Sequence, residues 1–95
     1  MFTRKELEAI DRNYFAVIVA NDYDVTLMSK NTHHVWRLHN AEMPDGNIVV
    51  IFHKHHASDP YHFHGRCGTL NGAMREIKRH DLFQLNGRKP VVRQA

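Results

Sequence analysis

Apolar residues at the start of the chain recur at helical spacing, at Leu7, Ile10, Tyr14 and Val17. The segment just before them, Thr3-Arg4-Lys5-Glu6, is typical of a capping box, in which Thr and Glu side chains satisfy backbone N–H groups of the first turn. The pattern predicts a first helix from about Thr3 to Val19. Residues 15–20 are rich in β-branched side chains, so a strand in that segment stays open as the alternative.

A period of two then replaces the helical spacing. Val25 and Leu27 alternate with polar residues, which predicts a first strand. His34, Trp36 and Leu38 would share one face of a second strand. The other face of that strand would then carry His33, Val35, Arg37 and His39. Residues 48–52 form a nearly continuous apolar run, which predicts a third, central strand that ends in a histidine-rich loop.

Helical spacing returns near the C-terminus at Leu70, Ala73, Met74 and Ile77, behind the N-cap candidate Thr69. These residues predict a helix from Leu70 to about His80. The expected fold is therefore α+β with the order α-β-β-β-α. It consists of a three-stranded antiparallel sheet with both helices on one face. Residues 1–85 would form one domain, and residues 86–95 a loose C-terminal tail.

Charge and cysteine content narrow the functional classes only slightly. Thirteen Lys and Arg against ten Asp and Glu give a net charge of +3, which permits a phosphate or nucleic-acid partner without requiring one. Cys67 is the single cysteine, so an internal disulfide and a cysteine-based zinc site are both excluded. With no signal-peptide pattern and no apolar stretch of about 20 residues, we expect a cytoplasmic protein that does not enter a membrane.

Histidine is the unusual component of the sequence. Nine histidines occur in 95 residues, and eight of them lie between His33 and His64. Imidazole titrates near neutral pH and is the commonest metal ligand in proteins. The cluster could therefore hold a metal ion, bind an anion or perform acid–base chemistry.

Three short segments resemble the HicA-type toxins, small mRNA interferases with a fold like the double-stranded RNA-binding domain. Thr32-His33-His34-Val35-Trp36-Arg37 stands where that family has a small residue followed by histidines. Ile48-Val49-Val50-Ile51-Phe52-His53 resembles the third strand of the family, and Gly68-Thr69-Leu70 resembles the start of its last helix. The similarity covers roughly residues 3–83, with Asn31 in place of a family glycine.

The resemblance implies RNA cleavage with His33 as the catalytic residue, since an imidazole can serve as base or acid in attack by the 2′-hydroxyl. It implies RNA as substrate and a cognate antitoxin as a partner. Whether the chain is an enzyme stays open. The residues expected to contact RNA are Lys30, Arg37, His53, His55, Tyr61, Arg75, Lys78 and Arg79.

Two other functions compete with this one. The chain could be a non-enzymatic interaction module of a mobile element or phage, in which the histidine-rich loop contacts a protein or only solvent. It could instead bind zinc, with Asp59 offering an oxygen ligand. The candidate zinc ligands in this loop are His53, His55, His62 and His64.

Overall fold

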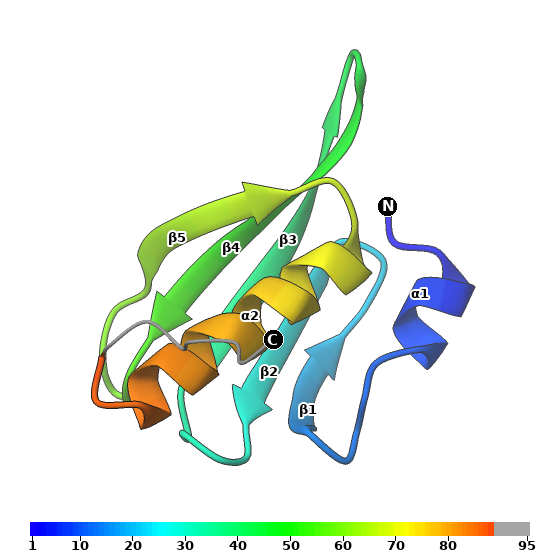
Figure 1. Cartoon of the computed structure of the whole chain (residues 1–95). Coiled ribbons are helices and arrows are strands. Elements are labelled where there is room, and N and C mark those ends of the chain that lie inside the picture. Colours follow the sequence, from blue (N-terminus) through cyan, green and yellow to red (C-terminus); the bar gives the residue numbers. More distant parts are fainter. Residues whose placement is uncertain (89–95) are drawn as a thin grey trace, which may run out of the picture.

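A computed structural model describes residues 1–88 of the chain. Two helices and five strands follow in the order α1 (Arg4–Glu8), β1 (Phe15–Ala20), β2 (Asp24–Ser29), β3 (Val35–Met43), β4 (Gly46–Lys54), β5 (His62–Cys67) and α2 (Leu70–Leu85). The strands form one antiparallel sheet in the order β1-β2-β3-β4-β5 (Figure 1). The α+β class is confirmed, but the expected sheet of three strands is wrong because five strands are present.

Residues 15–20 form β1, so the expected helix up to Val19 is wrong. The capping box is present, since Glu6 N donates to Thr3 Oγ1 and Thr3 N donates to Glu6 Oε1, both at 3.0 Å. The helix nevertheless ends at Glu8, and Asp11 accepts hydrogen bonds from the next backbone N–H groups in a turn. Pairing of the β-branched segment with β2 outweighs the local helical spacing.

The second additional strand, β5, lies within the stretch that the sequence predicts as a loop. A short turn separates it from β4, closed by Lys54 Nζ donating to Ala57 O at 2.9 Å and by Asp59 N donating to His56 O at 3.0 Å. The register between β4 and β5 shifts between Ile51 and Phe52. A shift of this kind in a short polar strand leaves no clear alternation in the sequence.

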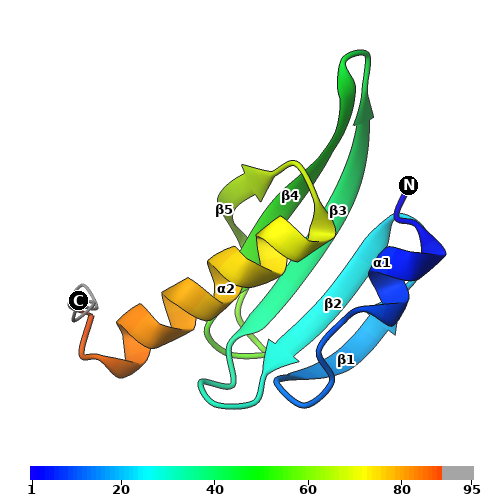
Figure 2. The ribbon, with the colours of Figure 1, turned by 45° about the vertical axis from the view of Figure 1, so that its right-hand side comes forward.

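The hydrophobic core lies between α2 and one face of the sheet, which we call the inner face. Leu70, Ala73 and Ile77 of α2 are fully buried there against side chains such as Trp36. Although α1 buries no residue of its own, Phe2 and Ile10 on either side of it belong to the same core. Figure 2 shows α2 crossing the sheet and α1 beside the β1–β2 end.

The last helix is longer than expected and continues beyond His80 to Leu85. Of the expected tail 86–95, residues 86–88 form a turn, and residues 89–95 lie outside the described part of the chain. The sheet face opposite α2, which we call the outer face, carries no helix within residues 1–88 (Figures 1 and 2).

Candidate metal centre

Three histidines from separate elements meet on the inner face. On β4, His53 continues the inward series of Val49 and Ile51, and it pairs across the sheet with Trp36. His34 precedes β3 and lies two residues before Trp36, on the same side of the chain. His80 follows Ile77 by three residues on α2, so the helical period turns it toward the sheet.

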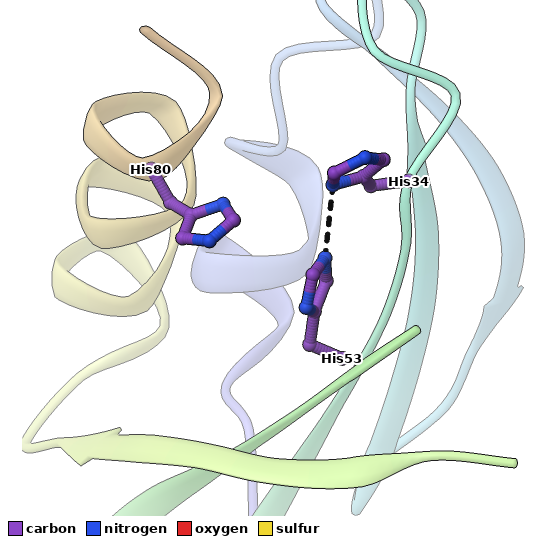
Figure 3. Close-up of side chains that lie close together, drawn as sticks. All are labelled: His34, His53 and His80. Atoms are coloured by element: carbon purple, nitrogen blue, oxygen red, sulfur yellow. Dashed lines mark hydrogen bonds between the residues drawn. The ribbon is translucent and has the colours of Figure 1, made fainter. Parts of the chain in front are cut away.

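The ring nitrogens of these three residues lie close enough to share one ion. His53 Nε2 lies 3.0 Å from His34 Nδ1. One nitrogen from each of His34, His53 and His80 can be chosen so that all three lie within 4.8 Å of one another. Figure 3 shows the three rings turned toward a common space between α2 and the sheet. Ligands of a tetrahedral zinc ion, at about 2.0–2.1 Å from the metal, lie about 3.4 Å apart, so small ring rotations would suffice.

The second ring nitrogen of His53 contacts another histidine. His53 Nδ1 lies 3.2 Å from His62 Nε2. A neutral imidazole carries one N–H and one bare nitrogen, so a proton on Nδ1 that is donated to His62 leaves Nε2 bare. Metal-bound histidines are commonly oriented in this way by a hydrogen bond from the other ring nitrogen. A hydrogen bond donated in this direction to His62 would orient the His53 ring and leave Nε2 free to bind an ion.

Further aromatic rings pack around the three histidines. Trp36 stacks on His53 with ring centroids 4.0 Å apart, and His55 stacks on His34 at 4.4 Å. His64 stands edge-on to Trp36 at 5.2 Å. The Trp36 indole N–H is itself satisfied, because it donates to Ser29 Oγ at 3.2 Å. His55 and His64 are half-buried and pack at the edge of this cluster, whereas His56 and His62 are exposed.

Burial keeps these imidazoles neutral. Desolvation, together with the neighbouring imidazoles, lowers the pKa of His53 from 6.5 to about 3. Burial likewise lowers the pKa of His34, His64 and His80, and the Asp81 carboxylate offsets part of that effect for His34 and His80. Neutral imidazole is the form that ligates metals, so no proton has to leave before an ion binds at neutral pH.

A buried carboxylate anchors this end of α2. Asp81 is fully buried and accepts hydrogen bonds from Tyr14 Oη at 2.6 Å and from Thr32 Oγ1 at 2.9 Å. Thr32 Oγ1 in turn accepts from His34 N at 3.3 Å. These bonds tie His80, the neighbour of Asp81 on α2, to the turn that carries His34. The carboxylate also supplies negative charge near a site for a cation.

A pocket of about 490 Å³ adjoins the cluster of His34, His53 and His80. His34 belongs to both, so the pocket gives solvent a route toward the three rings. Two other elements contribute to its wall, the loop after β4 and the end of α2. The lining residues are Thr32, His33, His34, His55, His56, Ala57 and Gln84.

His33, the expected catalytic residue, lies on the wall of this pocket. It is exposed and has a φ of 63°, in a turn before β3 rather than on the strand. His33 therefore does not share a strand face with Arg37 and His39, and the expectation that it would is wrong. The turn conformation arises because His33 N donates back to Ser29 O at 2.8 Å.

The residues expected to contact RNA are scattered over several surfaces. His53 is 1% exposed, so RNA cannot contact its ring and that expectation is wrong. Lys30 donates to Arg12 O, while Arg37 pairs with Asp24 on the outer face. The α2 residues Lys78 and Arg79 pair with Asp11 and Glu76, respectively. The remaining three are His55 on the pocket wall, Tyr61 beside Lys54, and Arg75 on the exposed side of α2.

The possibility of a histidine metal site is supported, but with a different set of ligands. Of the four histidines expected to bind zinc, only His53 belongs to the group of three. His55, His62 and His64 surround that group, and Asp59 instead accepts a hydrogen bond from His56 N. His80 was missed, although its helical spacing from Ile77 is a signal for an inward position.

No protein-family model, curated protein or solved structure matches this chain. Within residues 1–88, neither helix has the length and apolar character needed to cross a membrane.

Proposed function

We propose that this protein binds a divalent transition-metal ion through His34, His53 and His80. The observation that carries the proposal is the convergence of one ring nitrogen from each residue within 4.8 Å. The three residues come from the turn before β3, from β4 and from α2, so the site exists only in the folded chain.

The ligand chemistry favours zinc among the common ions. Imidazole suits zinc, copper and nickel, whereas magnesium and calcium prefer oxygen ligands. Three protein ligands leave one position of a tetrahedral zinc ion for water or substrate, as catalytic zinc sites do. His34 lines the pocket, which supports access of water or a small ligand to an ion held there.

One buried atom supports a ligand role over simple aromatic packing. His80 Nδ1 is buried and has no hydrogen-bond partner. Leaving a buried polar atom unpaired costs about 1–3 kcal/mol, and a bound cation beside the ring would offset that cost. Apolar packing alone would be served equally well by phenylalanine at this position.

Metal loading of the untagged protein tests the proposal. Cobalt(II) titration followed by absorption, with zinc competition and elemental analysis, should show one ion per chain. His80→Phe keeps an aromatic ring in the core but removes a ligand, so it should weaken binding by at least about 10-fold. His39→Phe is the matched control, because His39 lies on the outer face beside Asp24 and should leave loading unchanged.

Two results would contradict metal binding at this site. One is the lack of stoichiometric loading in the folded wild-type protein. The other is loading that His34→Phe and His80→Phe leave intact, which would place the ion on other histidines.

We propose RNA cleavage as a second candidate function, supported by the imidazoles that face one pocket. His33, His55 and His56 all line it, and cleavage through the 2′-hydroxyl needs one group to take a proton and another to give one. His33→Ala should then abolish cleavage of a labelled RNA while the protein stays folded. Activity that persists in a metal chelator would separate this function from the metal centre, and a folded wild type that leaves RNA intact would refute it.

A further inference from the structure

Aromatic rings and cations stand in cross-strand rows on the outer face. Arg37 of β3 pairs with Phe52 of β4, and Phe52 pairs with Phe63 of β5. The Arg37 guanidinium carbon lies 5.8 Å from the centre of the Phe52 ring. Side chains of directly paired residues project from the same face, so these three form one continuous row.

The neighbouring rows add one more aromatic ring and two more cations. Lys54 Nζ lies 4.3 Å from the centre of the Tyr61 ring, at the end of β4. In another row, Val50 pairs with Arg66 of β5. The outer face thus presents three aromatic rings, from Phe52, Tyr61 and Phe63, and three permanent cations, from Arg37, Lys54 and Arg66.

Negative charge is scarce on this face. Within residues 1–88, Asp24 is the one carboxylate at an outward strand position. It already accepts from Arg37 at 2.9 Å and from His39 at 3.0 Å. Neither Lys54 nor Arg66 forms an ion pair with a carboxylate in this part of the chain. The outer face therefore has an excess of positive charge for an anionic partner.

The exposure of an aromatic ring on this face indicates which kind of anionic partner would fit it. Phe63 is 61% exposed, although burying such a ring is strongly favourable. Unpaired bases offer flat π-faces that stack on aromatic side chains, while their phosphates pair with lysine and arginine. Duplex nucleic acid hides its bases within the stack and would leave these rings without a contact.

We propose that the outer face binds a single-stranded nucleic acid, with bases stacked on Phe52, Phe63 and Tyr61 and phosphates held by Arg37, Lys54 and Arg66. The surface lies on the side of the sheet away from the histidine centre. Binding there needs neither a metal ion nor a catalytic His33.

Fluorescence anisotropy with labelled oligouridine and oligothymidine of about 12 nucleotides tests this proposal on the untagged full chain. Binding should weaken steeply as salt rises, because each phosphate contact releases counterions. Phe63→Ala should weaken binding roughly 5- to 100-fold, the loss typical of one stacked base. Arg66→Gln should lower the salt slope by about one.

Arg75→Gln is the matched control, since it removes one charge from the exposed side of α2, away from the outer face. It should leave affinity within about 2-fold. A metal chelator should also leave binding unchanged, which separates this surface from the proposed metal site.

Several results would overturn the proposal. The first is that folded wild-type protein binds neither oligonucleotide at low salt. A second is binding that Phe63→Ala leaves unaffected, or that Arg75→Gln weakens equally. A third is that the protein binds no oligonucleotide but self-associates in sedimentation, and that Phe63→Ala abolishes the self-association. This result would identify the outer face as a contact between two copies of the chain.

Discussion

The two faces of the sheet use similar residue types in opposite ways. On the inner face, His53 packs against Trp36 with 1% of its surface exposed, and its pKa falls to about 3. On the outer face, His39 lies beside Asp24 and remains partly open to solvent. Aromatic rings follow the same division, since Trp36 is fully buried and Phe63 is 61% exposed. Burial lowers the pKa of His53 on the inner face, and it determines which aromatic rings stabilise the fold.

The largest expected difference between the two faces is in the stability lost when one aromatic ring is removed from each. Trp36→Ala should lower the free energy of unfolding by about 3–5 kcal/mol, because it leaves a cavity among the stacked histidines. Phe63→Ala should change it by at most about 0.5 kcal/mol, because that ring is largely in solvent. Urea denaturation of both variants measures the difference, and equal losses would show that the outer face also contributes to the core.

Zinc should stabilise the folded protein only by binding to the histidines of the inner face. At a free concentration about 100 times its Kd, zinc should raise the free energy of unfolding by about 2.7 kcal/mol, since the unfolded chain lacks the site. Thermal melts with zinc and then with a chelator measure this effect. The stabilisation should shrink to about 1.4 kcal/mol or less in His34→Phe and persist in full in His39→Phe. Full stabilisation in both variants would point to exposed histidines instead.

The buried and exposed carboxylates provide a third comparison. Asp81→Ala should cost about 1–3 kcal/mol, because the Tyr14 and Thr32 hydroxyls lose their common acceptor inside the protein. Asp24→Ala should cost about 0–1 kcal/mol, because its ion pair with Arg37 lies at the surface. Chemical denaturation measures the free energy of unfolding of both variants. A larger loss in Asp24→Ala than in Asp81→Ala would show that the surface carboxylate, and not the buried one, stabilises the fold more.

The fourth comparison concerns the pH dependence of stability that a single buried histidine contributes. The unfolded chain protonates His53 near pH 6.5, whereas burial holds its pKa in the folded state at about 3. Protons therefore favour the unfolded state between these values. Stability should be constant above pH 6.5 and fall by about 1.4 kcal/mol per pH unit below it for this residue.

His53→Phe should remove that part of the acid sensitivity, whereas His39→Phe should retain it. Denaturation midpoints between about pH 6.5 and 4.5 measure the slopes. If His53→Phe kept the wild-type slope, the inference that His53 is neutral in the folded protein would be wrong.

Parts of the fold were predictable because local chemistry decides them. The capping box at Thr3 and Glu6 forms as expected, and the apolar segments near Val25, Trp36 and Val50 are strands. Residues 15–20 were ambiguous, since the same side chains fit both periods and pairing with β2 decides between them. The strand β5 was missed because His62 and His64 flank Phe63 in a segment that looks polar until it pairs with β4.

Parts of the site were also present in the sequence. Alternation places His34 with Trp36, and the two-residue turn at Pro44 and Asp45 sets a register in which Trp36 faces His53. Helical spacing turns His80 toward the sheet. The angle at which α2 crosses the sheet brings that ring to the other two, and no local pattern encodes it.

The sequence alone determined the α+β class, the helix start at Thr3 and an abundance of imidazole. Tertiary structure decided how those imidazoles behave. The periodicity of a sequence indicates which side of a helix or strand a residue occupies. Whether several imidazole rings meet, and whether they are buried away from water, depends on segments that are distant in the chain. His34, His53 and His80 become a candidate metal site only when the turn before β3, strand β4 and helix α2 bring their ring nitrogens together.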